Sequence, residues 1–290
     1  ASPPARRLGA LVAVMDEAST VAMAAFDARG RPGVSVELEG RIARDAPAVN
    51  PGSEVRVATR VLKAGRTLAF ADVAVLDAAT GRPILNGRHV KYVGPQGSWL
   101  FDHVGSLVAA PVARRLADAY FRRLKIVETA PDLRDDDDDA PVFFEELLLE
   151  DDDATHVDAP SSTIRVERDV CNTMGSLHGG VSCLVAERAA LAKAQQQQRR
   201  DDPLLPVALR ATFLSALRPS AQAEVECQPL GPHTSAALGE NDDDDDDRSA
   251  APPDAAATGG VYSCRLLGGP HHAVAVDALV RLAPSSHLRR

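Results

Sequence analysis

The stretch from Cys171 to Ala194 is the sequence feature that most constrains the fold, because a polar turn containing glycines runs directly into a long apolar segment. That segment carries one acid, Glu187. Gly179 and Gly180 stand where the helix should begin, and the first N–H groups of a helix have no partner within it. Glycine also lets a ligand approach the backbone closely. The pattern therefore predicts a helix N-terminus that can bind a developing negative charge.

A similar helix is predicted near the start of the chain, over residues 8–26. Its acid, Asp16, follows Gly9 at the same distance at which Glu187 follows Gly180. Residues 8–26 are apolar on almost every side, which predicts a helix enclosed on all faces. The chain is therefore interpreted as an internal repeat.

Each helix is followed by short runs in which apolar and polar residues alternate, the pattern of antiparallel strands joined by short turns. One helix and then a meander of strands predicts an α+β fold in which a sheet wraps a long central helix. The expected strands of the first half fall between residues 34 and 94, and those of the second half at 143–149, 162–166, 207–217, 223–227, 261–267 and 273–282. A linker helix is expected over 112–126. The acidic tracts 135–139 and 240–260 are expected to be disordered, and the second is expected to interrupt the counterpart of the strand 66–76.

The length of 290 residues fits about two domains. Aspartate runs supply much of the net charge of −9, and clustered basic residues are missing, so no nucleic-acid partner is expected. The four cysteines, without a CxxC pair, are interpreted as scattered reduced thiols, which favours an intracellular location, either cytoplasmic or mitochondrial. No membrane span is expected, since Asp16 and Glu17 interrupt the apolar run at 8–26.

Asp16 is the first candidate for chemistry. An acid in a buried helix must face a polar cavity, be paired or be neutral, unless its stripe of the helix meets solvent or a partner helix. Apolar surroundings shift the pKa of a carboxylate towards the range that a general base needs. No metal site is expected at His178, because no other ligand stands at a suitable spacing from it. His89, His233, His271 and His272 are interpreted as strand-end or surface residues.

The pattern Asn172-x-x-Gly175-x-x-His178-Gly179-Gly180, with an acid nine positions after the histidine, resembles the hotdog-fold acyl-CoA thioesterases of the phenylacetyl-CoA type. The first half resembles the same family through GVSVELEG, PGSEVRVATRVLKAGRTLAFADVAVLDAATG and GRHVKYVG. The resemblance implies a tandem double hotdog. Residues 1–97 would form a first unit that is incomplete at its N-terminus, 98–140 a linker helix and acidic loop, and 141–285 a second unit with a disordered insertion at 240–260.

In this family the site lies between two hotdog units, so the resemblance implies a composite site. It assigns Asp16 as general base or nucleophile, Ser35 as its hydroxyl partner and Asn172 as a hydrogen-bonding group for the water or thioester. The second unit would add His178 and the Gly179 N–H. Glu187 is the candidate acid of a second site, which is expected to be degenerate because Arg7 replaces the histidine and no hydroxyl is in phase. Gly180, Arg66, Arg88 and Lys91 are candidates for binding coenzyme A, although solvated strand ends account for most of these cations.

The leading hypothesis is hydrolysis of an acyl-CoA to the free acid and CoA, with no cofactor beyond the coenzyme A of the substrate. The alternative is a non-catalytic acyl-CoA-binding or scaffold protein. A hotdog dehydratase or hydratase would need an Asp and His pair near the helix entry, which neither repeat shows. A homodimer of tandem chains is compatible with the sequence.

Overall fold

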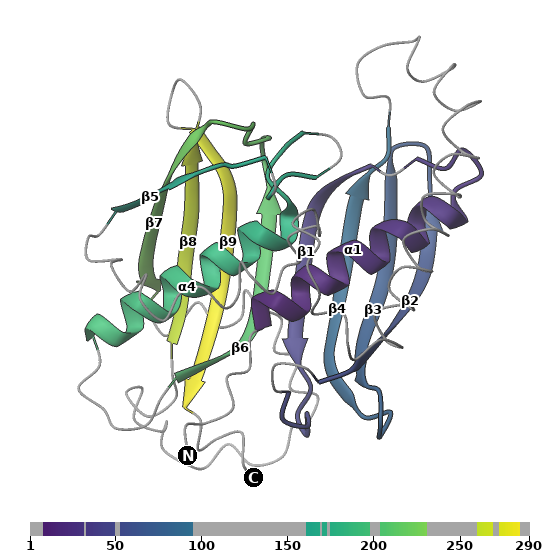
Figure 1. The fold of residues 1–290 in the computed structure, drawn as a ribbon, viewed down its shortest axis with the longest axis horizontal. Coiled ribbons are helices and arrows are strands. Elements are labelled where there is room, and N and C mark those ends of the chain that lie inside the picture. The colour runs from purple at the N-terminus through teal and green to yellow at the C-terminus, as the bar shows by residue number, and fades with distance from the viewer. Residues whose placement is uncertain are drawn as a thin grey trace, which may run out of the picture.

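The computed structural model describes residues 8–31, 33–49, 53–94, 161–168, 170–172, 175–197, 204–230, 260–268 and 273–284. These residues form two similar halves, each with one long helix lying across an antiparallel sheet (Figure 1). The first half comprises α1 (Leu8–Phe26), β1 (Val34–Ile42), β2 (Val55–Ala64), β3 (Leu68–Asp77) and β4 (Pro83–Tyr92). The second comprises β5 (Ser161–Arg165), α4 (Gly179–Gln197), β6 (Leu204–Phe213), β7 (Gln222–Leu230), β8 (Gly260–Gly268) and β9 (Ala273–Pro284).

The strands of the two halves join into one sheet in the order β2-β3-β4-β1-β6-β9-β8-β7-β5. The join is the antiparallel pair β1 and β6, in which Glu39 lies opposite Arg210. An ion pair between Glu37 and Arg210, 2.7 Å from nitrogen to oxygen, adds a side-chain contact across the same join. Because backbone hydrogen bonds run through the join, the two helices are held at fixed positions on a common sheet.

Strand register shows which residues of the two halves are equivalent. A register shift lies between Ser35 and Glu37 where β1 pairs with β4, and another lies between Pro206 and Ala208 where β6 pairs with β9. The two shifts are separated in sequence by the same interval as Gly9 and Gly180. The interval that relates the two helices therefore also relates β1 to β6.

Glycines let the two helices approach closely at their N-terminal ends. A Cβ added at Gly180 would lie 2.5 Å from the Cα of Ala13 on α1. A Cβ added at Gly9 would lie 2.9 Å from the Cα of Leu184 on α4. Each glycine therefore lies against the backbone of the opposite helix, where no larger residue fits without moving that helix.

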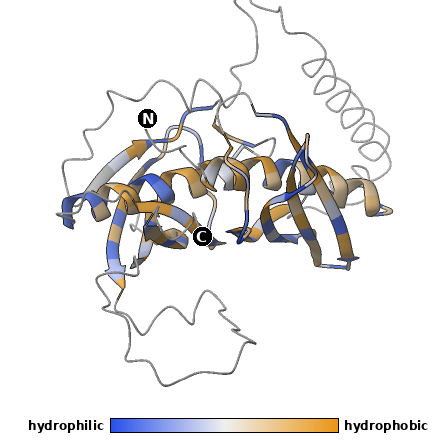
Figure 2. Cartoon of the chain, turned by 90° about the horizontal axis from the view of Figure 1, so that it is seen from below, coloured by the Kyte–Doolittle hydropathy of each residue, from blue (hydrophilic) through white to orange (hydrophobic). Residues whose placement is uncertain are grey.

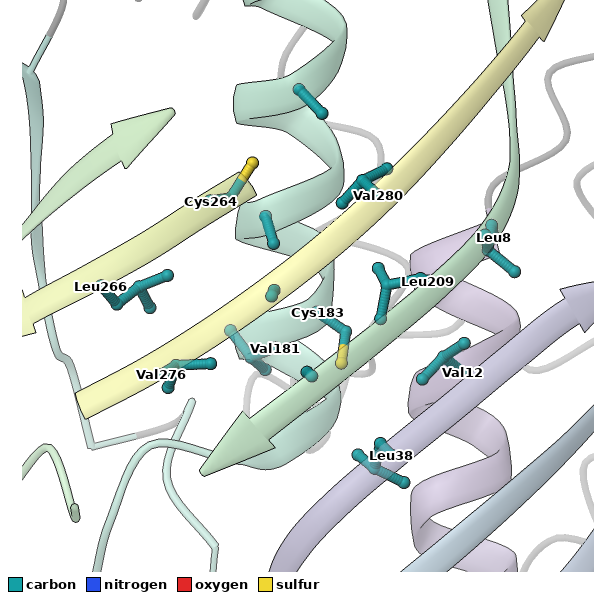
Figure 3. Close-up of a cluster of buried hydrophobic side chains, with 14 of the residues drawn as sticks. Leu8, Val12, Leu38, Val181, Cys183, Leu209, Cys264, Leu266, Val276 and Val280 are labelled. Carbon is teal, nitrogen blue, oxygen red and sulfur yellow. The ribbon is translucent and has the colours of Figure 1, made fainter. Parts of the chain in front are cut away.

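One apolar cluster extends through both halves between the helices and the sheet. Figure 3 shows part of it, with Leu8 and Val12 on α1, Val181 and Cys183 on α4, and strand residues such as Leu38 and Leu209. Hydrophobic and hydrophilic residues are interspersed along the strands (Figure 2), and every second residue of β3 from Ala69 to Val75 is buried. The helices thus bury the sheet's apolar face, as the α+β prediction requires.

The prediction that α1 is enclosed on all faces is wrong, since Val14 and Phe26 are exposed. By length and composition α1 could cross a membrane, but half of it is buried within the fold and Asp16 lies near its middle. Packing against the sheet and α4 accounts for much of its apolar character.

The acidic insertion also differs from expectation. Residues 231–259, which are outside the described residues, connect β7 to β8, and these are separate strands paired along their length. The equivalent connection in the first half is the short turn between β2 and β3, so the tract lies between two strands rather than inside one. The linker helix at 112–126, the acidic run 135–139 and the strand at 143–149 also lie outside the described residues.

We expect Gly9→Ala to lower the free energy of unfolding by about 1–3 kcal/mol, because the new methyl group would push α4 away from α1. Helix propensity alone would raise the free energy of unfolding, since alanine is favoured over glycine in a helix. Urea unfolding of this variant measures the difference, with Ala18→Gly as the matched control, for which propensity predicts a loss of about 1 kcal/mol. A stabilised Gly9→Ala protein would contradict the close contact.

Candidate active site

Asp16, near the middle of α1, lies at the N-terminus of the opposite helix. Its side chain is buried, with 2 % of the residue exposed. The backbone N–H of Gly180 donates to Oδ2 at 3.0 Å, and Nδ1 of His178 lies 3.2 Å from the same oxygen. A carboxylate at a helix N-terminus is favoured by the unpaired N–H groups and the helix dipole. An acid from the first half is thus placed among donors from the second.

The other carboxylate oxygen of Asp16 faces groups from β1 and β4. The Ser35 hydroxyl donates to Oδ1 at 3.2 Å, and Nε2 of His89 lies 3.0 Å from Ser35 Oγ and 3.5 Å from Oδ1. On its far side, His89 Nδ1 lies 2.6 Å from the hydroxyl of Ser19, one turn along α1. These four side chains form one continuous hydrogen-bonded chain that ends on Asp16.

His89 was interpreted from sequence as a strand-end or surface residue, and that interpretation is wrong, because none of it is exposed. The alternation along β4 could have predicted this burial. His89 alternates with the exposed Asn86 and Arg88 and lies on the same, inward face as Leu85. The helix α1 covers that face of the sheet, which is why a polar residue there meets the site instead of water.

Burial lowers the pKa of His89 to about 3, against a smaller opposing effect of Asp16, so the ring is neutral near pH 7. A neutral imidazole carries one N–H, and we assign it to Nε2, which faces the carboxylate of Asp16. With this tautomer His89 donates to Ser35, and Ser35 donates to Asp16. The Ser19 hydroxyl, which lies 2.6 Å from His89 Nδ1, also donates to the Met15 carbonyl oxygen at 2.6 Å.

His178 has the opposite character. Burial would lower its pKa, but the hydrogen bond to Glu17 and the charge of Asp16 raise it above its ordinary value. Its two ring nitrogens lie 3.2 Å from Asp16 Oδ2 and 3.5 Å from Glu17 Oε2. In the protonated ring both nitrogens donate, which suits two carboxylate partners.

The charge state of Asp16 follows from these neighbours. Burial raises its pKa, but His89, His178, Lys91 and the Gly180 N–H together lower it, and the net pKa lies below the ordinary value. The side chain is therefore an anion near neutral pH, buried but well supplied with donors.

Gly179 provides the first N–H of α4, and within the described part of the chain that N–H donates to no acceptor. A Cβ at this position would lie 2.8 Å from Asp16 Oδ2 and 3.2 Å from Leu38 and Phe213 side-chain atoms. Glycine is therefore required next to the acid.

The three predicted CoA-binding cations are not gathered in one place. Arg88 forms an ion pair with Asp72 on the outer face of the sheet, Nε to Oδ1 3.3 Å, and Arg66 is exposed near the β2–β3 turn. Lys91 is not a solvated strand end: it is 4 % exposed, and its Nζ donates to Thr20 Oγ1 at 2.7 Å. The structure thus places Lys91 beside the acid, separate from the other two, while the N–H of Gly180 is directed at Asp16.

Asn172 lies in the turn that precedes α4. Its side chain exchanges hydrogen bonds with Ser176, Nδ2 to Oγ at 3.1 Å and the Ser176 N–H to Oδ1 at 3.2 Å. These contacts shape the loop that presents His178 and Gly179. Its predicted contact with substrate or water stays a prediction.

Glu187 occupies the position equivalent to Asp16 and accepts a hydrogen bond from the Gly9 N–H, the mirror of the Gly180 contact. The surroundings differ, however, because apolar residues replace the polar groups found around Asp16. Spacing and strand register give the equivalent positions in the second half: Ala190 for Ser19, Pro206 for Ser35, Val280 for His89 and Leu282 for Lys91. Leu8 stands in place of Gly179. The positions that carry hydroxyl, imidazole and ammonium groups around Asp16 are therefore occupied by apolar residues around Glu187.

Among the described residues, no cluster of three or more histidine, cysteine, aspartate or glutamate side chains could hold a metal ion. The chemical resources around Asp16 are accordingly a carboxylate, a free N–H at a helix start, and hydroxyl and imidazole donors. This combination can bind an oxyanion and accept a proton at neighbouring points.

The raised pKa of His178 predicts a pH-dependent stability. Because the folded state binds the proton more tightly than the unfolded chain, the contribution is complete below the unfolded pKa of about 6.5 and is lost as pH rises through the folded pKa. We expect the difference in unfolding free energy between wild type and His178→Gln to shrink as pH rises above about 6.5. Urea titrations at several pH values measure it, and a difference that is constant over that window would contradict the pairing with Asp16 and Glu17.

Comparison with known proteins adds independent information. No family model matches the chain. Acyl-coenzyme A thioesterase 13 of Mus musculus and of Homo sapiens are each 40 % identical to it over 86 residues. The matched part is 30 % of this chain and 59 % of each relative, so the chain spans about three fifths of the length of these curated proteins.

Solved structures share the fold over nearly the whole chain. The 12:0-ACP thioesterase from Umbellularia californica covers 98 % of it, with 93 % of its own length, a TM-score of 0.53 and 8 % identity. A protein described as an oleoyl thioesterase from Lactobacillus plantarum covers 94 %, with 86 % of its own length, a TM-score of 0.50 and 10 % identity. At such low identity they are evidence for the fold alone. Together with the sequence relatives, they show that the chain is similar to hotdog-fold thioesterases, in fold over most of its length and in sequence over 86 residues.

Proposed function

We propose that this protein is an acyl-CoA thioesterase that hydrolyses an acyl-CoA thioester to the free acid and CoA. The observation that carries the proposal is the buried Asp16 carboxylate beside the free N–H of Gly179, with donors from both halves of the chain around it. The sequence relatives named acyl-coenzyme A thioesterase 13 support the class of substrate.

In the proposed reaction, the Gly179 N–H binds the thioester carbonyl oxygen and stabilises the negative charge that develops there. Asp16 either takes the proton from an attacking water or attacks the carbonyl carbon itself. The helix dipole of α4 favours the charged intermediate, since the oxygen lies at its N-terminus. Collapse of that intermediate expels the thiolate of CoA. Where Asp16 has taken a proton from the attacking water, that proton goes to the thiolate and the free acid is formed directly. Where Asp16 has attacked the carbonyl carbon, water then hydrolyses the acyl–Asp16 anhydride to the free acid and supplies the proton for the thiol.

The hydrogen-bonded chain from Ser19 through His89 to Ser35 has a positioning role in this proposal. It fixes Oδ1 of Asp16, so that the carboxylate keeps one orientation towards the carbonyl carbon. An acid held by directed donors loses less entropy on reaching the transition state than one free to rotate.

We further propose that the chain is a tandem double hotdog with one working site. Residues 1–97 and 141–285 would be the two units, and the working site would combine Asp16 and Ser35 from the first with His178 and Gly179 from the second. Support comes from the asymmetry described above. Glu187 keeps the contact with a helix N-terminus, but the four positions that are polar around Asp16 are apolar around Glu187.

We expect Asp16→Asn to lower turnover by on the order of 10³-fold, the size of a general-base contribution, while acyl-CoA binding is retained. Glu187→Gln is the matched control and should turn over substrate close to the wild-type rate. Thiol release from short, medium, long and aromatic acyl-CoAs measures both variants beside the wild type. Binding without turnover by the wild type would favour the non-catalytic acyl-CoA-binding alternative, and loss on Glu187→Gln alone would assign the working half to the other acid.

His89→Phe should lower kcat by on the order of tenfold to a hundredfold, because it keeps the ring volume but removes the donor that orients Ser35 and Asp16. His89→Gln supplies an N–H at a similar distance and should recover part of the loss. Steady-state kinetics that separate kcat from KM distinguish this effect from general damage to the fold. Equal losses in the two variants would argue against a positioning role.

A further inference from the structure

Two of the four cysteines, interpreted from sequence as scattered, face each other on neighbouring strands. Cys227 on β7 lies directly opposite Cys264 on β8, and their sulfur atoms are 2.9 Å apart. Residues opposite each other in an antiparallel pair share one face of the sheet, and here it is the face that packs against α4. Figure 3 shows Cys264 in the apolar cluster beside that helix.

The two thiols differ in access to solvent and in acidity. Cys264 is fully buried, whereas Cys227 is partly exposed. The hydrogen bond from Cys264 lowers the pKa of Cys227, against an opposing effect of burial and with a further lowering by Lys193 of α4. That same bond, together with burial, raises the pKa of Cys264. Cys227 is therefore the thiol that can reach a reagent as a thiolate, and Cys264 is its resolving partner.

The remaining cysteines are less suited to such chemistry. Cys183 is fully buried, and burial together with the charges of Asp16 and Glu187 raises its pKa well above the ordinary value. Cys171 lies before α4, and its thiol donates to the Glu167 carbonyl at 3.2 Å. Of the four cysteines, Cys227 and Cys264 are therefore the two best suited to thiol–disulfide exchange.

We propose that Cys227 and Cys264 form a reversible modification site, at which a low-molecular-weight disulfide such as oxidised glutathione introduces an intramolecular disulfide bond. The Cys227 thiolate attacks one sulfur of glutathione disulfide, breaks its S–S bond and releases one glutathione, which takes up a proton. Cys264 then loses its proton and attacks the Cys227 sulfur, and the second glutathione leaves. The two protein thiols lose two electrons and two protons, and glutathione disulfide gains them.

Little movement is needed for this bond. The sulfurs must approach from 2.9 Å to about 2.05 Å, and the opposed strand positions already bring the two side chains together. The bond would link two strands whose chain connection runs through residues 231–259, so it closes a long loop in the unfolded chain and should stabilise the second half.

The proposal is independent of the catalytic one. Lys193, which lies near the thiol pair, is about 20 Å along α4 from Gly179 at the helix rise of about 1.5 Å per residue. The disulfide should therefore change stability and leave the rate of any reaction at Asp16 unaltered.

The test uses the full chain incubated in glutathione redox buffers, followed by acid quenching, alkylation and peptide mass spectrometry. We expect a loss of two hydrogens in mass, a peptide linking β7 to β8, and a melting temperature raised by on the order of 5 °C, all reversed by dithiothreitol. In Cys264→Ala, Cys227 should instead accumulate a glutathione adduct, whereas in Cys227→Ser the buried Cys264 should stay unmodified. Cys171→Ser serves as the control and should form the same link as the wild type.

Full alkylation of both thiols in wild-type protein after exposure to the most oxidising buffer would overturn the proposal. So would a link that involves Cys171 or Cys183 instead of the proposed pair. Because mass is read on the wild-type chain, neither outcome depends on the folding of a variant.

Discussion

The structure depends on a reciprocal contact in which each central helix places a buried carboxylate on the N-terminus of the other. Asp16 of α1 accepts the Gly180 N–H, and Glu187 of α4 accepts the Gly9 N–H. Helix N-termini carry unpaired donors and a partial positive charge, so a carboxylate there satisfies both partners at once. Glycine at both positions lets the backbones come close enough for the contact to form. The two halves are therefore joined by electrostatics at the helices as well as by strand pairing at β1 and β6.

The same contact has different consequences in the two halves. Around Asp16, a lysine and two histidines are buried with the acid, an arrangement that would be costly if any of them lacked a partner. Each has one: His89 bonds to Ser19 and Ser35, His178 contacts both Asp16 and Glu17, and Lys91 donates to Thr20. Around Glu187 the corresponding residues are apolar and pack in the core. One half retains a polar site within the fold, and the other uses the same backbone geometry for packing.

Cys183 lies in the apolar core, close enough to both buried acids for their charges to affect its thiol. It sits on α4 within the core, and both Asp16 and Glu187 contribute to the rise in its pKa. The thiol stays protonated there and acts as a small apolar residue. Cys227 and Cys264 are in a different situation, because the outer strands place one of them near solvent. The acidity of a thiol in this protein thus depends on its burial and on the groups beside it.

The sequence by itself determined the local elements and half of the site. Spacing identified both helices, and alternation identified most of the strands, because these patterns arise from side-chain direction along a single element. Asp16, Ser35, His178 and Gly179 could be named because an acid in an apolar helix and a glycine pair at a helix start are unusual locally, and the family resemblance linked them. Only the tertiary structure decided that His89 and Lys91 face the acid, that Arg88 points away from it, and that Cys227 meets Cys264. Those relations depend on which strand lies beside which and on register between distant segments, and a change of one residue in register turns every side chain to the opposite face of the sheet.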